Sequence, residues 1–214
     1  MATKENFNAK LLVEGNDDQH VIWALCEKFG LSKTFDVIDC RGVDNLYKQI
    51  PVRFKQSDVN TVGIIIDADT ELQSRWDSLK GILIAQGFEI PDMLPEQGLV
   101  TTNTENKKVG VWIMPDNNTN GMLEDFIAFL VPKDDELLPI VNSTLQSIEE
   151  QKLNKYSLSH KSKATIHSWL SWQKDPGTPM GLGITKKYLT TDEVTCKKLI
   201  DWMKTLFSRT EKMN

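Results

Sequence analysis

Short apolar runs alternate with stretches of helical spacing through the first part of the chain. The apolar runs are bounded by polar residues and rich in aliphatic side chains, as strands are; they are residues 10–15, 34–40 and 61–67. The intervening stretches repeat their apolar residues every three or four positions, as one face of a helix requires; they are residues 17–30, 43–54 and 71–86. This order predicts an α/β fold with a mostly parallel sheet and helices on both faces.

Local residue types suggest where several of these elements begin and end. Asp17 or Asp18 can cap the start of the first helix, and Gly30 can end it. Pro51 predicts a break in the second helix, because proline lacks the N–H that a helix interior uses. Residues 176–185, PGTPMGLGIT, are rich in Gly and Pro and predict a loop.

The second half of the chain changes character. Residues 98–104 and 108–116 predict two more strands, and a turn at Gly121 precedes a helix. Amphipathic helices follow, and they are residues 134–151, 161–175 and 191–207. We therefore expect an α/β core in residues 1–130 and a helical C-terminal extension in residues 131–214, packed on the core as one compact unit.

Composition and charge narrow the class of protein. Of the 214 residues, 40% are hydrophobic and 26% are charged, as in an ordinary globular protein. No apolar run is long enough to cross a membrane, and the first residues, MATKENFNAK, lack the apolar core of a signal peptide. We therefore expect a cytoplasmic protein without membrane contact. The three cysteines are isolated in sequence, which favours reduced structural thiols.

The charge is unevenly distributed along the chain. Residues 1–150 hold 13 Lys and Arg against 25 Asp and Glu, a net charge of −12, whereas residues 151–214 hold 12 against 5, a net charge of +7. A basic segment beside an acidic one indicates contact with a polyanion. The alternative is a solvated, lysine-rich helical surface.

Acidic residues follow two of the predicted strands. Glu14 ends the first strand, with Asp17 and Asp18 just beyond it, and Asp67 and Asp69 end the third. If these strands are neighbours, the carboxylates converge at the carboxyl edge of the sheet, where open α/β folds bind ligands. A hard divalent cation, Mg²⁺ or Mn²⁺, would relieve their repulsion. The alternative for Asp17 and Asp69 is helix capping.

The pairing of LLVEGNDD with IIIDADTE resembles the Toprim domain of topoisomerases, bacterial primases and OLD (overcoming lysogenization defect) nucleases. Glu14 matches the glutamate motif of that family, and Asp67 and Asp69 match its DxD. The resemblance covers residues 8–130 and implies a compact α/β fold with Mg²⁺-dependent phosphodiester chemistry. Residues 114–126 and 163–179 resemble small stand-alone Toprim-like proteins related to the OLD group.

OLD-type sites resemble two-metal nucleases, which have further acids and a lysine beyond the DxD. The candidates for these acids are Asp18, Glu71, Asp116, Glu124 and Asp125. Glu124 also stands where an acid suits a helix N-terminus. Lys163 is the candidate cation for a phosphate, with Lys161 second, and Gly15 would leave room for that phosphate. For each lysine alone, the alternative is a solvated surface.

The predicted function is that of a metal-dependent nuclease acting on DNA or RNA, in a defence or repair system. A binding module that acts with a partner protein, such as an ATPase, is the alternative from another class. DADTE also echoes the DxD of haloacid dehalogenase phosphatases, but their nucleophile lies on the first strand. A receiver-like phosphoacceptor would explain neither Glu14 nor Asp69.

Overall fold

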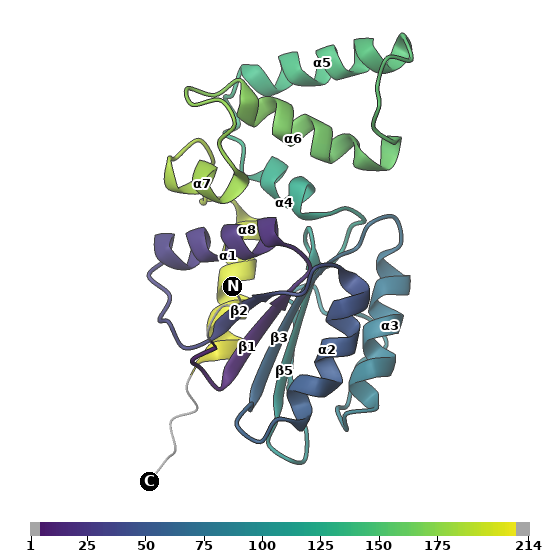
Figure 1. Ribbon diagram of the computed structural model, residues 1–214, viewed down its shortest axis with the longest axis vertical. Coiled ribbons are helices and arrows are strands. Elements are labelled where there is room, and N and C mark those ends of the chain that lie inside the picture. Colours follow the sequence, from purple (N-terminus) through teal and green to yellow (C-terminus); the bar gives the residue numbers. More distant parts are fainter. Residues whose placement is uncertain (1–4, 209–214) are drawn as a thin grey trace.

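The computed structural model describes residues 5–208 and contains a five-stranded sheet with helices on both faces (Figure 1). The strands are β1 (Ala9–Val13), β2 (Asp36–Asp39), β3 (Thr61–Asp67), β4 (Leu99–Thr102) and β5 (Lys108–Met114). Their order across the sheet is β2-β1-β3-β5-β4. The first, second, third and fifth strands run parallel, and β4 pairs antiparallel with β5. The predicted α/β class with a mostly parallel sheet is confirmed.

The helices fall into three groups around the sheet (Figure 1). One face carries α2 (Val43–Lys55) and α3 (Leu72–Ile84), and the other carries α1 (Asn16–Lys28) and α8 (Val194–Phe207). The remaining helices extend from the carboxyl edge of the sheet toward the top of the view. They are α4 (Leu123–Phe129), α5 (Leu137–Glu150), the 3₁₀ helix η1 (Leu158–His160), α6 (Lys161–Ser171) and α7 (Met180–Thr185).

Strand β3 shows why the sheet is covered on both faces. Ile64 and Ile66 belong to the core beneath α2 and α3, whereas Ile65 belongs to the core beneath α1 and α8. All three side chains are fully buried. Because successive strand residues point to opposite faces, a strand buried on both sides is apolar throughout.

Two glycines allow the C-terminal helix α8 to lie directly on the sheet. Gly63 and Gly110 are paired in the β3–β5 ladder. A Cβ atom on Gly63 would lie 2.9 Å from a Leu206 methyl, and one on Gly110 would lie 2.7 Å from the same methyl. The C-terminal segment therefore contributes to the core under β3 and β5. The division of the chain at residue 130 stays a prediction.

The predicted break at Pro51 is wrong, because α2 continues through the proline to Lys55. Leu46, Ile50 and Phe54 are buried on both sides of it and fix one continuous helical face on the sheet. This packing outweighs the backbone hydrogen bond that proline removes.

The loop predicted for residues 176–185 is also partly wrong, because Met180–Thr185 forms α7. Met180 and Ile184 are buried under α1 and α6 and hold the turn in place. A Cβ on Gly181 would lie 2.6 Å from the His20 carbonyl oxygen, so this glycine permits close contact between α7 and α1.

Two simpler predictions concern the membrane and the cysteines. No helix within residues 5–208 is long and apolar enough to cross a membrane. Cys26, Cys40 and Cys196 are all free thiols, and burial raises the pKa of each above its ordinary value. They therefore lie within the structure as unreactive, apolar side chains.

Candidate functional site

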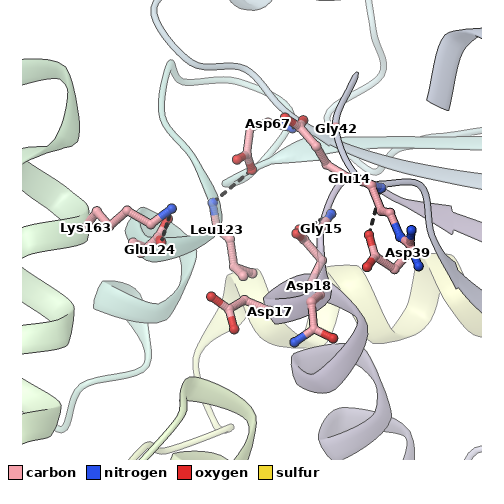
Figure 2. Close-up of a pocket in the computed structure, with 12 residues that line it drawn as sticks. Glu14, Gly15, Asp17, Asp18, Asp39, Gly42, Asp67, Leu123, Glu124 and Lys163 are labelled. Carbon is pink, nitrogen blue, oxygen red and sulfur yellow. Dashed lines mark hydrogen bonds and ion pairs between the residues drawn. The ribbon is translucent and has the colours of Figure 1, made fainter. Parts of the chain in front are cut away.

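A cavity of about 470 Å³ opens at the carboxyl edge of the sheet, between α1, α4 and α6 (Figure 2). Acidic side chains dominate its lining, and they are Glu14, Asp17, Asp18, Asp39, Asp67 and Glu124. Two cations, Arg41 and Lys163, also line it. We call this cavity the acidic pocket.

Glu14 and Asp67 meet in the acidic pocket because β1 and β3 are neighbours in the sheet. The backbone N–H of Asp67 donates to Glu14 Oε2 at 3.4 Å. Asp67 Oδ1 in turn accepts a hydrogen bond of 2.9 Å from the N–H of Leu123, the first residue of α4 (Figure 2). Of the three carboxyl groups predicted to converge at one sheet edge, those of Glu14 and Asp67 line the acidic pocket together, whereas that of Asp69 does not line it.

Burial and neighbouring negative charges oppose the ionisation of both groups. Burial, followed by the charge of Asp69, raises the pKa of Glu14. Burial raises the pKa of Asp67 well above its ordinary value, and the charges of Asp18, Glu14 and Glu124 raise it further. The pocket thus concentrates negative charge that its own backbone donors do not neutralise.

Asp18 is the most buried carboxylate of α1, with 6% of its surface exposed. Its Oδ2 accepts the Gly15 N–H at 3.0 Å, so Gly15 is the N-cap and Asp18 closes the first turn. The expectation that Asp17 or Asp18 would be the N-cap is corrected to this arrangement. Asp18 Oδ1 is buried and has no hydrogen-bond partner within residues 5–208. Burial and the charge of Glu14 raise the pKa of Asp18 to about 7.

Glu124 brings α4 and α6 together at the side of the acidic pocket. Its side chain is almost fully buried, and Oε1 lies 3.4 Å from Lys163 Nζ and 3.9 Å from His167 Nε2. Figure 2 shows Lys163 reaching from α6 to this carboxylate. Burial alone would lower the pKa of Lys163, but the charges of Glu124, Asp17 and Asp67 raise it above its ordinary value. Lys163 is therefore held as a cation at the pocket.

Asp69 lies outside the lining of the acidic pocket. Its carboxylate pairs with Arg75, and its backbone, at a φ of 52°, donates to the Gly121 carbonyl at 2.8 Å. The two aspartates of the DAD stretch thus take different directions: Asp67 lines the pocket, and Asp69 closes the turn toward α3.

The other acidic candidates are held by local structure. Glu71 is the exposed N-cap residue of α3, and Asp116 Oδ1 accepts the N–H groups of Asn118 and Thr119 at 3.0 and 2.8 Å. Asp125 accepts the Met122 N–H and the Ser162 hydroxyl. None of the three lines the acidic pocket.

Lys161 also points to a different partner. Its Nζ lies 2.7 Å from Glu149 Oε2 on α5, and it does not line the acidic pocket. Gly15 does line the pocket, beside Glu14. Of the two lysines singled out in sequence, the structure brings only Lys163 to the acids.

Asp39 and Arg41 are pocket residues that the sequence analysis missed. Asp39 ends β2, so the rule that ligands bind at the carboxyl ends of parallel strands applies to it as it does to Glu14. Asp39 Oδ1 accepts the Arg41 N–H at 2.8 Å, and Arg41 has a φ of 59°. The sequence DCRG after the second strand is the feature that could have indicated them.

The donor chemistry of the acidic pocket fits a hard divalent cation. It offers carboxylate oxygens, which such ions prefer, and one buried oxygen of Asp18 still lacks a partner among the described residues. Burial and then repulsion between the acids raise these pKa values, and a cation would remove the repulsion. In residues 5–208, no three His, Cys, Asp or Glu side chains are close enough to bind one ion as they stand. Binding would therefore require the carboxylates to draw together.

Comparison with known proteins gives one structural relative and one family. The chain is similar to the C-terminal region of the OLD protein of Xanthomonas campestris pv. campestris, with 11% identity and a TM-score of 0.44 over 94% of this chain and 96% of that one. No curated protein matches the chain. The model of the family described as "Protein of unknown function (DUF3226)" matches residues 8–208. The chain therefore belongs to the DUF3226 family.

Proposed function

We propose that this protein is a divalent-metal-dependent phosphodiester-cleaving enzyme, a nuclease of Toprim and OLD type. The observation that supports it best is the meeting of Glu14, Asp18 and Asp67 in one pocket, where burial and then neighbouring negative charges raise their pKa values. A structural cluster would carry its own counter-ions. This cluster is left with excess negative charge at the edge where α/β sheets bind ligands.

The pocket residues divide into two roles under this proposal. Glu14, Asp18 and Asp67, with Glu124, would hold Mg²⁺ or Mn²⁺. When bound, the ion would polarise the phosphoryl group and lower the pKa of an attacking water. Lys163 lies 3.4 Å from Glu124 and would neutralise a phosphate oxygen beside the metal. Arg41, which also lines the pocket, offers a second cation to the polynucleotide backbone.

The proposal is tested by cleavage of labelled DNA and RNA, assayed in parallel, with Mg²⁺, Mn²⁺ or EDTA. We expect cleavage with either metal and none with EDTA. Glu14→Gln and Asp67→Asn should each lower it on the order of 1000-fold. Asp77→Asn is the matched control, since Asp77 is exposed on α3 and its side chain, among residues 5–208, accepts a hydrogen bond from Gln73 alone. Activity in the two pocket variants equal to the wild type would refute the proposal.

The second candidate is a binding module that keeps the acidic pocket but acts through a partner such as an ATPase. The observation that favours it is the spacing of the pocket acids, no three of which are close enough to bind one ion within residues 5–208. Calorimetric titration with Mg²⁺ and Mn²⁺ distinguishes the two. Metal binding lost in Asp67→Asn supports the enzyme, whereas an absence of both metal binding and cleavage supports the module.

A further inference from the structure

A second and larger cavity, of about 1290 Å³, runs along the edge strand β2. Its floor is β2 with the residues on either side of it, and its walls come from α1 and α2, which flank this edge in Figure 1. Asn16, Asp39 and Arg41 line both this cavity and the acidic pocket. The two cavities therefore join at the carboxyl end of β2. We call the larger cavity the β2 groove.

Four acidic and three basic residues line the β2 groove, and within residues 5–208 two of the acids, Glu27 and Asp39, and all three bases make no ion pair. Glu5 pairs with Arg53 and Lys10, and Asp36 pairs with Lys10. Lys33, Arg41 and Lys48, by contrast, make no ion pair with any residue in the part of the chain that the structure describes. Although the chain carries a net charge of −5, this groove presents cations that have no partner in the described residues.

The β2 groove also contains an exposed aromatic ring. Trp23, on α1, has 40% of its surface exposed and lines the groove. The ring of His20 lies 5.1 Å from it in an edge-to-face arrangement, and the exposed part of the indole is open to a ligand. Side-chain amides of Asn45 and Gln49 line the opposite wall.

Cations beside an exposed aromatic ring form the pattern with which proteins hold single-stranded nucleic acid. The cations contact the phosphates, and the ring stacks on bases, which are free to stack only when the strand is unpaired. We propose that the β2 groove binds a single-stranded polynucleotide and leads its backbone past Arg41 into the acidic pocket. This inference rests on the proposed function for the identity of the polymer, because the acidic pocket, to which we assign phosphodiester cleavage, stands at the end of the groove.

The test measures binding separately from cleavage. Fluorescence anisotropy of a labelled single strand of about 12 nucleotides, DNA and RNA in parallel, is recorded in EDTA so that no strand is cut. We expect Trp23→Ala to weaken binding at least about 5-fold, since stacking of one base contributes at least that much. Arg41→Ala combined with Lys48→Ala should lower the slope of log K against log salt by about 1.4, or about 0.7 for each phosphate contact.

Matched controls come from side chains outside both cavities. Trp172 is 46% exposed at the end of α6, and Lys155 is exposed before η1. Trp172→Ala and Lys155→Ala should leave both the affinity and the salt slope unchanged. Because Trp23 is already exposed, its alanine variant should fold normally, which a thermal melt checks.

An assay with a small phosphodiester substrate distinguishes a failure of the groove assignment from a failure of the proposed function. Bis(4-nitrophenyl) phosphate is too short to occupy the β2 groove, so Trp23→Ala should turn it over at the wild-type rate, while Asp67→Asn should not turn it over. If no form cleaves this compound or the labelled DNA and RNA, but Trp23→Ala still weakens strand binding, the proposed function fails and the groove assignment stands.

Two results would overturn the groove assignment. One is equal affinity of wild type and Trp23→Ala for both single strands. The other is a wild-type dimer in analytical ultracentrifugation that Trp23→Ala converts to monomer, since a second copy of the chain would then occupy the β2 groove.

Discussion

Charged residues are buried at both ends of strand β1. At the amino end they pair with opposite charges, whereas at the carboxyl end acids lie beside other acids. At the amino end, Lys10 is only 3% exposed and lies 3.1 Å from Glu5 and 2.8 Å from Asp36. Although burial on its own raises the pKa of both acids, hydrogen bonds to Lys10 and, for Glu5, to Arg53 hold each below its ordinary value. At the carboxyl end, Glu14 meets further acids, and its pKa is raised.

The contrast separates a structural ion cluster from a candidate binding site. Charges at the amino end are satisfied within the chain, so the fold itself accounts for them. Charges at the carboxyl end repel one another, and backbone N–H groups supply most of their hydrogen bonds. Their raised pKa values mean that the ionised carboxylates are unfavourable despite these hydrogen bonds, so an external cation is the simplest reason for the arrangement.

The sharpest way to test this contrast is to remove one acid from the carboxyl end. Asp67→Asn should lower metal-dependent cleavage on the order of 1000-fold, because one charged ligand contributes several kcal/mol to metal-stabilised charge in the transition state. Without metal, the free energy of unfolding should hold or rise, because a repulsive charge is lost and the amide oxygen can still accept the Leu123 N–H.

Calorimetry of the metal-free variant supplies the check on that prediction. A melting temperature well below that of the wild type would make Asp67 a structural residue. Gln in place of Glu71, which is exposed and outside the acidic pocket, is the comparison that should change neither stability nor cleavage.

At the amino end of β1, removing a charge should lower stability and leave cleavage unchanged. Lys10→Met leaves Asp36 and Glu5 without their buried partner, and we expect a loss of about 3 kcal/mol in the free energy of unfolding. Urea denaturation measures this loss. Cleavage per folded molecule should stay at the wild-type level, and a selective loss of cleavage in a stable Lys10→Met protein would erase the distinction between the two ends.

Much of the fold and part of the acidic pocket could be predicted from the sequence, because both depend on short-range patterns. The apolar runs and helical spacing predicted every strand and most helices, and Glu14 and Asp67 could be placed together once β1 and β3 were taken as neighbours. Strand ends are local, and the parallel order brings them to one edge.

The errors arose where tertiary contacts decide the outcome. Pro51 reads as a break, but burial of Ile50 and Phe54 keeps α2 continuous. The sequence also could not predict which partner each charged side chain would face. Asp69 turns to Arg75 and Lys161 to Glu149, and both partners lie elsewhere along the chain or on another helix.

The raised pKa values make the stability of the metal-free protein depend on pH. A carboxyl whose pKa is raised by folding stabilises the protein fully below its ordinary pKa, and this stabilisation is lost as the pH rises through the folded value. For Asp18 the loss should run from about pH 4 to about pH 7. We expect a fall of about 2 kcal/mol in the free energy of unfolding between pH 5 and pH 7, at about 1.4 kcal/mol per pKa unit.

Two comparisons isolate the source of this pH dependence. The lowered pKa values of Glu5 and Asp36 change the free energy of unfolding below about pH 4.5. The change between pH 5 and pH 7 is therefore assigned to the acidic pocket. Asp18→Asn should flatten the profile, as should saturating Mg²⁺. A wild-type free energy of unfolding that is constant or rises from pH 5 to pH 7 would show that the pocket acids are compensated after all.

The smallest expected effect concerns two lysines of one helix that differ in what they face. Lys163 lies 3.4 Å from Glu124 at the acidic pocket, whereas Lys161 lies 2.7 Å from Glu149 on α5. A polynucleotide approaching the acids needs cations to offset them, so Lys163→Ala should reduce the slope of log K against log salt by about 0.7, as for a single phosphate contact of a single strand. Lys161→Ala, on the same helix, should leave the slope unchanged because its charge is already paired. Equal slopes in wild type and both variants, with binding intact, would mean that α6 only carries solvated lysines, and the binding module would then explain the acidic pocket better than the nuclease.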